Sequence, residues 1–213
     1  MELIDDLKKR FEKKLPAEKA HSTLMNYDRK TAAEILRDKE HVKESAVLCL
    51  LFRINEEWNF YLMLRNSYKG VHSAQVGFPG GKREENDKNF IETALREANE
   101  ELGIKSSEVE IIGELSTMYI PPSNFLVYPY VAVALNDQEI IPDPIEVKEV
   151  IHAKLSDILK EDAVSESKVE VSGGSERMKV KHYTIDGHIV WGATGMMLAE
   201  LAHIIKETGY KSK

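Results

Sequence analysis

The sequence lacks the features that mark exported, disulfide-linked or membrane-spanning chains. Its 213 residues include a single cysteine, Cys49, so no disulfide can form within the chain, which agrees with a reducing compartment. No apolar run approaches the roughly 20 residues that are needed to span a bilayer. The first residues, MELIDDLKKRFEKK, lack the apolar core of a secretory signal. We therefore expect a cytoplasmic protein with no membrane partner.

A strongly basic segment is also missing. The 29 lysines and arginines are outnumbered by 36 aspartates and glutamates, which gives a net charge of −7. No long basic stripe is available to neutralise the phosphates of a nucleic-acid polymer, so such a polymer is not an expected partner. A small anionic substrate is compatible with this charge, because a local basic cluster or a bound cation can reverse the field inside an acidic protein.

The composition and the hydrophobic spacing are typical of a soluble domain. Apolar residues make up 42% and charged residues 31%, and the length suffices for one well-packed domain. The spacing predicts helices over residues 2–15, 31–39 and 193–207. Strands are predicted over residues 45–53, 58–65, 109–120, 125–135, 168–171, 178–185 and 188–192, and residues 146–159 as a strand that runs into a short helix. This order predicts a mixed sheet between helices, an α/β (α+β) fold, over residues 1–213 with an N-terminal helical extension over about residues 1–40.

Residues 78–104 contain a helix with an unusual concentration of carboxylates. If the helix begins near Asn89 and winds at about 100° per residue, its apolar side chains share one arc. Glu97, Glu100 and Glu101 fall in the adjoining arc, with Glu101 at the edge of the apolar face. Like charges at this spacing repel, and burial raises the cost for Glu101, so the cluster predicts a nearby positive charge. Oxygen-only ligands suit a hard cation such as Mg²⁺ or Mn²⁺.

A simpler alternative is a solvated helix face with salt bridges, in which Arg96 pairs with Glu97 or Glu100 through its forked guanidinium. The segment Phe-Pro-Gly-Gly before the helix favours the metal site. Two consecutive glycines allow a sharp turn or a close approach to a ligand, and they offer a carbonyl oxygen as a further ligand.

The same stretch resembles the Nudix box, whose pattern is filled here by Gly81, Arg96, Glu97, Ala98, Glu100, Glu101, Gly103 and Ile104. Two positions depart from that pattern: Asp87 replaces the first glutamate, and eight residues rather than seven separate it from Arg96. The longer spacing, the aspartate and the segment FPGGK resemble the coenzyme A pyrophosphatase branch of the Nudix hydrolases. Other segments are similar to that branch as well, among them LPAEKAH, VHSAQVGFPGGK, PPSNFLVYPYVAV, EVKEV and VWGATGMML.

The resemblance implies a Nudix-type α/β/α sandwich and an Mg²⁺- or Mn²⁺-dependent hydrolase of a small nucleotide diphosphate substrate. Coenzyme A or acyl-CoA, cleaved to 3′,5′-ADP and (acyl-)4′-phosphopantetheine, is the substrate implied by the branch. ADP-ribose, NADH or another dinucleotide is an alternative within the same chemistry. A nucleotide-binding sensor without catalysis is an alternative of another class. The resemblance also leaves a homodimer open.

The resemblance assigns roles to individual residues. Glu97 and Glu101 are expected to bind the metal with the carbonyl of Gly81, Glu100 directly or through water, and Arg96 to orient the carboxylates. The residues expected to be catalytic are thus Glu97, Glu100 and Arg96. The box does not identify the general base, for which Glu146 and Glu149 are candidates. Basic or polar side chains around the turn are candidate phosphate ligands or merely solvated loop residues: Arg65, Lys69, His72, Lys82 and Arg83. Asp87 is expected to stabilise the loop.

Overall fold

The structure, a computed structural model, describes residues 2–25, 30–38, 41–66, 75–170 and 177–211. Its centre is an eight-stranded mixed sheet with the strand order β3-β2-β1-β7-β5, in which β4 also pairs with β1, β6 with β7 and β8 with β2. The strands are β1 (Lys43–Ile54), β2 (Glu57–Arg65), β3 (Val76–Gly77), β4 (Gly80–Lys82), β5 (Val109–Glu114), β6 (Met118–Ile120), β7 (Phe125–Ala134) and β8 (Val147–Lys154). Only the β1–β7 pair is parallel among the described pairs.

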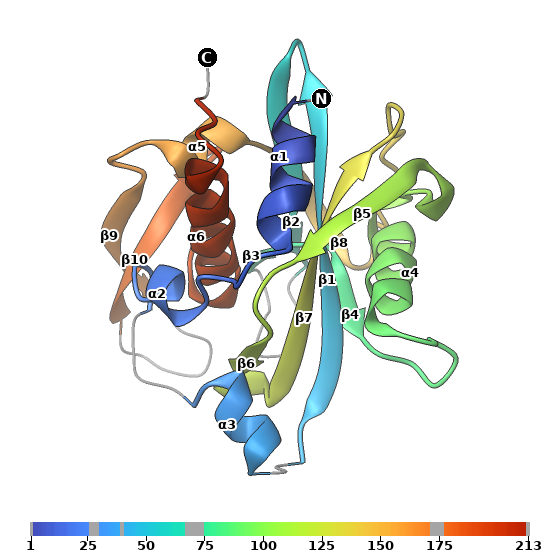
Figure 1. Cartoon of the computed structure of the whole chain (residues 1–213). Coiled ribbons are helices and arrows are strands. Elements are labelled where there is room, and N and C mark those ends of the chain that lie inside the picture. The colour runs from blue at the N-terminus through green and yellow to red at the C-terminus, as the bar shows by residue number, and fades with distance from the viewer. Residues whose placement is uncertain (1, 26–29, 39–40, 67–74, 171–176, 212–213) are drawn as a thin grey trace.

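Helices cover both faces of this sheet (Figure 1). On one face lies α4 (Phe90–Leu102), and on the other lie α1 (Glu2–Phe11) and α6 (Gly192–Glu207). The predicted α/β sandwich with a mixed sheet is therefore confirmed. The remaining helices are short: α2 (Glu18–His21), α3 (Ala32–Arg37) and α5 (Leu155–Leu159), with 3-10 turns η1 (Ser106–Glu108) and η2 (Pro121–Ser123). Within the described residues, no helix is long and apolar enough to cross a membrane.

The nearly continuous apolar sequence of β1 follows from this layering. Successive side chains of a strand point to opposite faces. Leu48 and Leu50 pack in the core beneath α4, while Cys49 and Leu51 pack in the core beneath α1 and α6. Both faces are therefore apolar, and burial raises the pKa of the Cys49 thiol well above its usual range.

Two predictions about the strands were incomplete. The segment 109–120, predicted as one strand, divides into β5 and β6, because Ser116 leaves the ladder and donates from N and Oγ to the carboxylate of Glu200. The last strands form a second, three-stranded antiparallel sheet of β9 (Val164–Glu170), β10 (Arg177–Ile185) and β11 (His188–Val190). This sheet lies beside α6 in Figure 1 and is not part of the main one.

Glu200 joins the N-terminal segment to the rest of the structure. Its fully buried carboxylate accepts hydrogen bonds from Ala17 N at 2.9 Å, Ser116 N at 2.9 Å and Ser116 Oγ at 2.6 Å, and it lies 3.1 Å from His21 Nε2. Burial acts to raise the pKa of Glu200, but the hydrogen bonds from His21 and Ser116 outweigh burial and lower the pKa overall. The group is therefore a stabilising carboxylate at neutral pH.

We expect Glu200→Gln to lower the free energy of unfolding by about 2–4 kcal/mol at pH 7, because the amide leaves buried donors without an acceptor. Since the pKa is lowered in the folded state, this contribution is present above the ordinary carboxyl pKa and is lost as the pH falls. Urea unfolding checks the value. Glu207→Gln, at the exposed end of the same helix, should cost no more than about 1 kcal/mol. Equal losses in the two variants would contradict this assignment.

Candidate active site

The carboxylate helix begins and ends where its capping residues predict. Asn89 is the N-cap, and its side chain accepts a hydrogen bond from Glu92 N at 2.9 Å. Gly103 ends the helix at a φ of 71°, a left-handed conformation that favours glycine. The predicted start near Asn89 is thus confirmed, and Glu101 lies on the face of the helix that is buried against the sheet.

The two glycines of β4 bring the backbone against that face. Gly80 has a φ of 152°, and a Cβ there would lie 2.3 Å from Ala46 O. Its N–H donates to Glu101 Oε2 at 2.7 Å. A Cβ on Gly81 would lie 2.4 to 2.6 Å from the carboxylate atoms of Glu97. A side chain at Gly80 would overlap backbone atoms, whereas a side chain at Gly81 would have to displace the Glu97 carboxylate.

Arg96 contacts three acidic side chains, those of Asp87, Glu97 and Glu100. Its Nε and Nη2 form a fork with the two carboxylate oxygens of Asp87, each at 3.0 Å, and its Nη1 lies 2.9 Å from both Glu97 Oε1 and Glu100 Oε2. Nη2 also donates to the carbonyl of Lys82 at 3.0 Å. The Arg96 fork holds the pKa of Asp87 well below its usual range. Asp87 stabilises the loop before the helix, as predicted.

Glu101 is far more buried than Glu97 and Glu100 and does not contact Arg96. It is 1% exposed, and its Oε1 lies 2.9 Å from Arg65 Nη1. The two groups are close but not aligned for a hydrogen bond, so Oε1 has no hydrogen-bond donor within the described part of the chain. Arg65 Nη2 donates instead to Gly80 O at 2.7 Å. Burial raises the pKa of Glu101 to about 7, against the opposing effects of Arg65 and Gly80 N.

Of the two candidate bases, the structure brings Glu146 close to the box. Its charge acts to raise the pKa of both Glu97 and Glu101, which shows that it lies within electrostatic reach of these groups. Glu149 lies on the face of the sheet opposite to α4. There its Oε1 is 3.3 Å from Nε2 of His188 on β11. Burial also raises the pKa of Glu97, while Arg96 lowers it.

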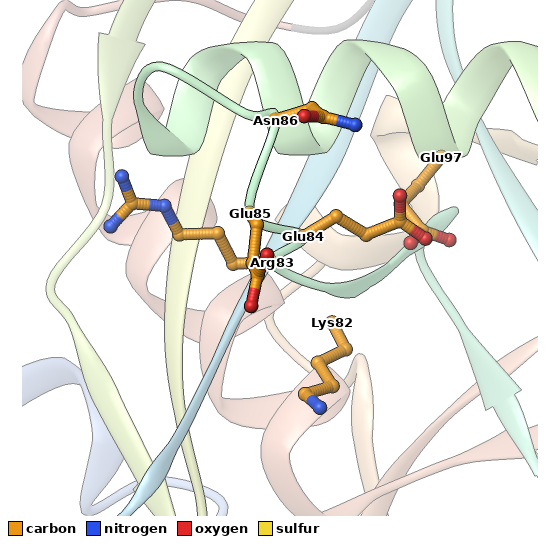
Figure 2. A pocket seen from close by; sticks show the side chains of 6 residues that line it. All are labelled: Lys82, Arg83, Glu84, Glu85, Asn86 and Glu97. Atoms are coloured by element: carbon orange, nitrogen blue, oxygen red, sulfur yellow. The ribbon is translucent and has the colours of Figure 1, made fainter.

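A cavity of about 450 Å³ opens beside these groups, between β4 and α4 (Figure 2). It is lined by Lys82, Arg83, Glu84, Glu85, Asn86 and Glu97. In Figure 2 the Arg83 side chain points away from Glu97. Its guanidinium lies 4.9 Å from the ring centre of Phe90, which itself stacks on Tyr128 at 3.7 Å. The exposed Lys82 forms no ion pair with another described residue.

The predicted site residues have different partners in the structure. Glu97 and Glu100 contact Arg96, whereas Glu101 contacts Gly80 and Arg65. Glu97 and Glu101 still lie against the adjacent residues Gly81 and Gly80 of β4. Arg65, expected to bind substrate, is engaged with Glu101 and Gly80. Lys69 and His72 lie outside the described residues. The two sets differ because Arg96 Nη1 reaches Glu97 and Glu100, while Glu101 is buried beside Gly80 and Arg65.

Several supporting residues were not predicted from the sequence. Thr93 is fully buried and donates to Asp87 Oδ2 at 2.9 Å. Asn66 and Asp143 bond the backbone around Glu146. A signal for Asp143 is present in the segment Pro-Asp-Pro, since aspartate side chains commonly accept from the amides two or three residues ahead in turns.

The donor chemistry of the site fits a hard divalent cation. Glu101 Oε1 is buried without an aligned donor, and the carboxylate of Glu97 lies directly over Gly81. Among the described residues, no group of three or more His, Cys, Asp or Glu side chains is arranged to hold a metal by itself. Mg²⁺ does not require such a cage, because it usually keeps several waters and binds one or two protein carboxylates together with substrate phosphates.

Sequence comparison agrees with this combination of loop, helix and carboxylates. The family model described as the NUDIX domain matches residues 42–171, more than half of the chain, and the chain belongs to the Nudix hydrolase family. It is 32% identical over 145 residues to the uncharacterized Nudix hydrolase NudL of Photorhabdus laumondii, covering 68% of this chain and 76% of that one. It is 34% identical over 170 residues to NudL of an Enterobacter species, covering 78% and 84%.

Solved structures share the fold. A Caenorhabditis elegans Ap4A hydrolase matches with a TM-score of 0.52 at 14% identity, over 78% of this chain and 99% of that chain. The MutT protein of Methanosarcina mazei matches with a TM-score of 0.51 at 16% identity, over 79% and 96%. At these identities the likeness concerns the fold alone. Nudix hydrolases generally use divalent ions such as Mg²⁺ or Mn²⁺, which agrees with the donor chemistry of the site.

Gly81→Ala should displace the Glu97 carboxylate, because the new methyl group would overlap it. A shift of about 1 Å at a reacting centre can cost about 100-fold in rate, and we expect a loss of that size in kcat/KM. Gly77→Ala is a matched control, since a Cβ there meets only Thr194 Oγ1 at an ordinary 3.6 Å. Steady-state kinetics of the two variants provide the measurement. A Gly81→Ala enzyme as active as Gly77→Ala would contradict the proposed contact.

Proposed function

We propose that the chain hydrolyses the diphosphate linkage of coenzyme A or acyl-CoA, with Mg²⁺ or Mn²⁺, to 3′,5′-ADP and (acyl-)4′-phosphopantetheine. The observation that carries the choice of branch is the pairing of Asp87 with Arg96. The aspartate and its eight-residue spacing are the features that resemble the coenzyme A pyrophosphatases. Here Asp87 is buried and takes both ends of the Arg96 fork. Asp87, which replaces the first glutamate of the general box, is thus a packed part of the site.

The metal would be held by Glu101, by Glu97 and by the carbonyl of Gly81, with Glu100 bound directly or through water. When bound, the ion supplies positive charge that offsets the charge of the diphosphate oxygens. Arg96 keeps Glu97 and Glu100 oriented, through contacts of 2.9 Å to each. Lys82 lines the same cavity as Glu97, where its ammonium can face a phosphate.

Glu146 is the group that we assign as the general base. Water attacks one phosphorus atom, a new P–O bond forms, and the bond from that phosphorus to the bridging oxygen breaks. The proton of the attacking water passes to the Glu146 carboxylate, and the bridging oxygen leaves with the other phosphate. Both side chains are exposed, but Glu146 acts electrostatically on Glu97 and Glu101, whereas Glu149 faces His188 on the other side of the sheet. Glu146 therefore suits this role better.

A diphosphate panel tests the proposal. The purified protein is incubated with coenzyme A, acetyl-CoA, ADP-ribose, NADH and Ap4A, with Mg²⁺ or Mn²⁺, and the products are identified by mass spectrometry. Formation of 3′,5′-ADP and 4′-phosphopantetheine at the highest kcat/KM supports the proposal. Hydrolysis of the other compounds alone would assign the chain to the dinucleotide alternative. Tight binding of a nucleotide without turnover would indicate the sensor alternative, against which the intact box residues argue.

A further inference from the structure

The loop between β7 and β8 is tied to the C-terminal end of the box helix. Its amide groups at Ile141 and Asp143 donate to the carbonyls of Leu102 and Glu101, each at 2.9 Å. These carbonyls belong to the last turn of α4, where the helix itself offers no partner. Glu101 therefore contacts the site with its side chain and anchors this loop with its backbone.

Asp143 organises the turn that follows. Its Oδ1 accepts hydrogen bonds from Ile145 N at 2.6 Å and from Glu146 N at 3.2 Å. Its carbonyl accepts from Val147 N at 2.9 Å, where β8 begins. A carboxylate that accepts two amides fixes the backbone direction at both residues. Asp143 thus fixes the backbone from which the Glu146 side chain projects.

Asn66, which directly follows β2, holds the same turn. Its N–H donates to Glu146 O at 2.9 Å, and its Nδ2 donates to the carbonyls of Pro144 at 2.9 Å and Ile145 at 2.8 Å. Asn66 directly follows Arg65, whose guanidinium contacts Glu101. The backbone of Glu146 is therefore bonded on both sides, at N by Asp143 and at O by Asn66, within a unit that also includes Glu101.

We propose that Asp143 and Asn66 are positioning residues that hold Glu146 at the distance and direction needed to accept the proton of the attacking water. This inference rests on the proposed function, in which Glu146 is the base. Here Asn66 donates three hydrogen bonds to residues 144–146, and Asp143 accepts two more from amides within the same turn. These bonds surround Glu146, which carries the proposed base.

The test is a double-mutant cycle between Asp143→Ala and Glu146→Gln. In the presence of Glu146, Asp143→Ala should lower kcat about 10- to 100-fold with KM changed less than about threefold, as expected when a reacting group is misplaced. In the Glu146→Gln background, the same change should have no further effect. Asp143→Asn should restore most of the activity, because its amide oxygen can still accept from Ile145 N and Glu146 N. Asn66→Ala should resemble Asp143→Ala.

Two measurements separate positioning from a loss of structure. Hydrogen exchange of residues 144–147 should accelerate in Asp143→Ala and stay slow in Asp143→Asn, while Mn²⁺ affinity, measured by electron paramagnetic resonance, should stay unchanged in both. Asp137→Ala, in the same loop but exposed, is the control and should keep wild-type kinetics. The inference is overturned if Asp143→Ala is as active as the wild type, if its loss is the same in both backgrounds, or if Asp143→Asn is equally impaired. Inactivity of the wild type toward the whole panel would reject the proposed function and the inference together.

Discussion

Glu101→Gln should lower kcat/KM by about 10³-fold or more without unfolding the protein. A metal ion supplies several kcal/mol of charge stabilisation in the transition state, and each 1.36 kcal/mol corresponds to a factor of ten. Glutamine keeps the shape of the side chain and an oxygen that can accept from Gly80 N, now at 2.7 Å from Glu101 Oε2. It removes the charge at the one buried carboxylate oxygen that has no aligned donor in the described residues. Steady-state kinetics and an Mn²⁺ titration measure the two effects.

Glu92→Gln is the matched control for this change. It alters the same residue type on the same helix, at the first turn and away from the cavity, where Glu92 accepts from Lys88 N at 2.9 Å. We expect wild-type activity and Mn²⁺ affinity for this variant. A thermal unfolding curve for each variant shows whether the fold is retained. Unchanged Mn²⁺ affinity in a folded Glu101→Gln protein would remove Glu101 from the assigned ligand set.

The helix and its burial were predictable because the signals are local. The cap at Asn89, the glycine at position 103 and the period of the apolar side chains all lie within residues 89–103. Placing Glu101 at the edge of the apolar face required only the geometry of a helix. In the structure Glu101 is fully buried, at 1% exposure, and is thus more buried than a position at the edge of the apolar face requires. The family is confirmed, while the coenzyme A branch stays a prediction.

The partner of Glu101 could not be derived in this way. Arg65 stands 36 positions earlier, at the end of β2, and meets Glu101 only because β2 and α4 are brought together by the fold. By sequence position it was one of several cations near the turn, and each could bind a phosphate or simply be solvated. Tertiary contacts of this kind carry no local pattern. The same holds for Glu200, whose partners come from two distant segments, one with Ala17 and His21 and the other with Ser116.

The choice between the two candidate bases depends on an irregularity in a strand pair. In a regular strand, residues 147 and 149 would point to the same face. The register of β2 and β8 shifts between Leu64 and Arg65, so that Val147 pairs with Arg65 and Glu149 with Leu64. Val147 consequently packs in the core beneath α4, while Glu149 shares the other face with Ile151. A β-bulge leaves no signal in alternating hydrophobicity that would identify it beforehand.

Glu146→Gln should therefore lower kcat by about 10²- to 10⁴-fold, the range expected for the loss of a general base. The exposed side chain contributes little packing, and its backbone bonds to Asp143 and Asn66 do not involve the carboxylate, so stability should change little. KM and Mn²⁺ affinity should remain close to those of the wild type. The measurement is the pre-steady-state rate of diphosphate cleavage, because it isolates the chemical step from product release.

Glu149→Gln supplies the comparison that decides the assignment, since it makes the identical change three positions along the chain. Its carboxylate faces His188 at 3.3 Å on the side of the sheet away from Glu101, so its loss should leave kcat within about twofold of the wild type. The reverse result, a silent Glu146→Gln and an impaired Glu149→Gln, would place the proton acceptor on the opposite face and require β8 to rearrange when substrate binds. Equal and small effects in both variants would instead indicate that the proton passes to a carboxylate of the box helix itself, for which Glu100 is the most exposed candidate.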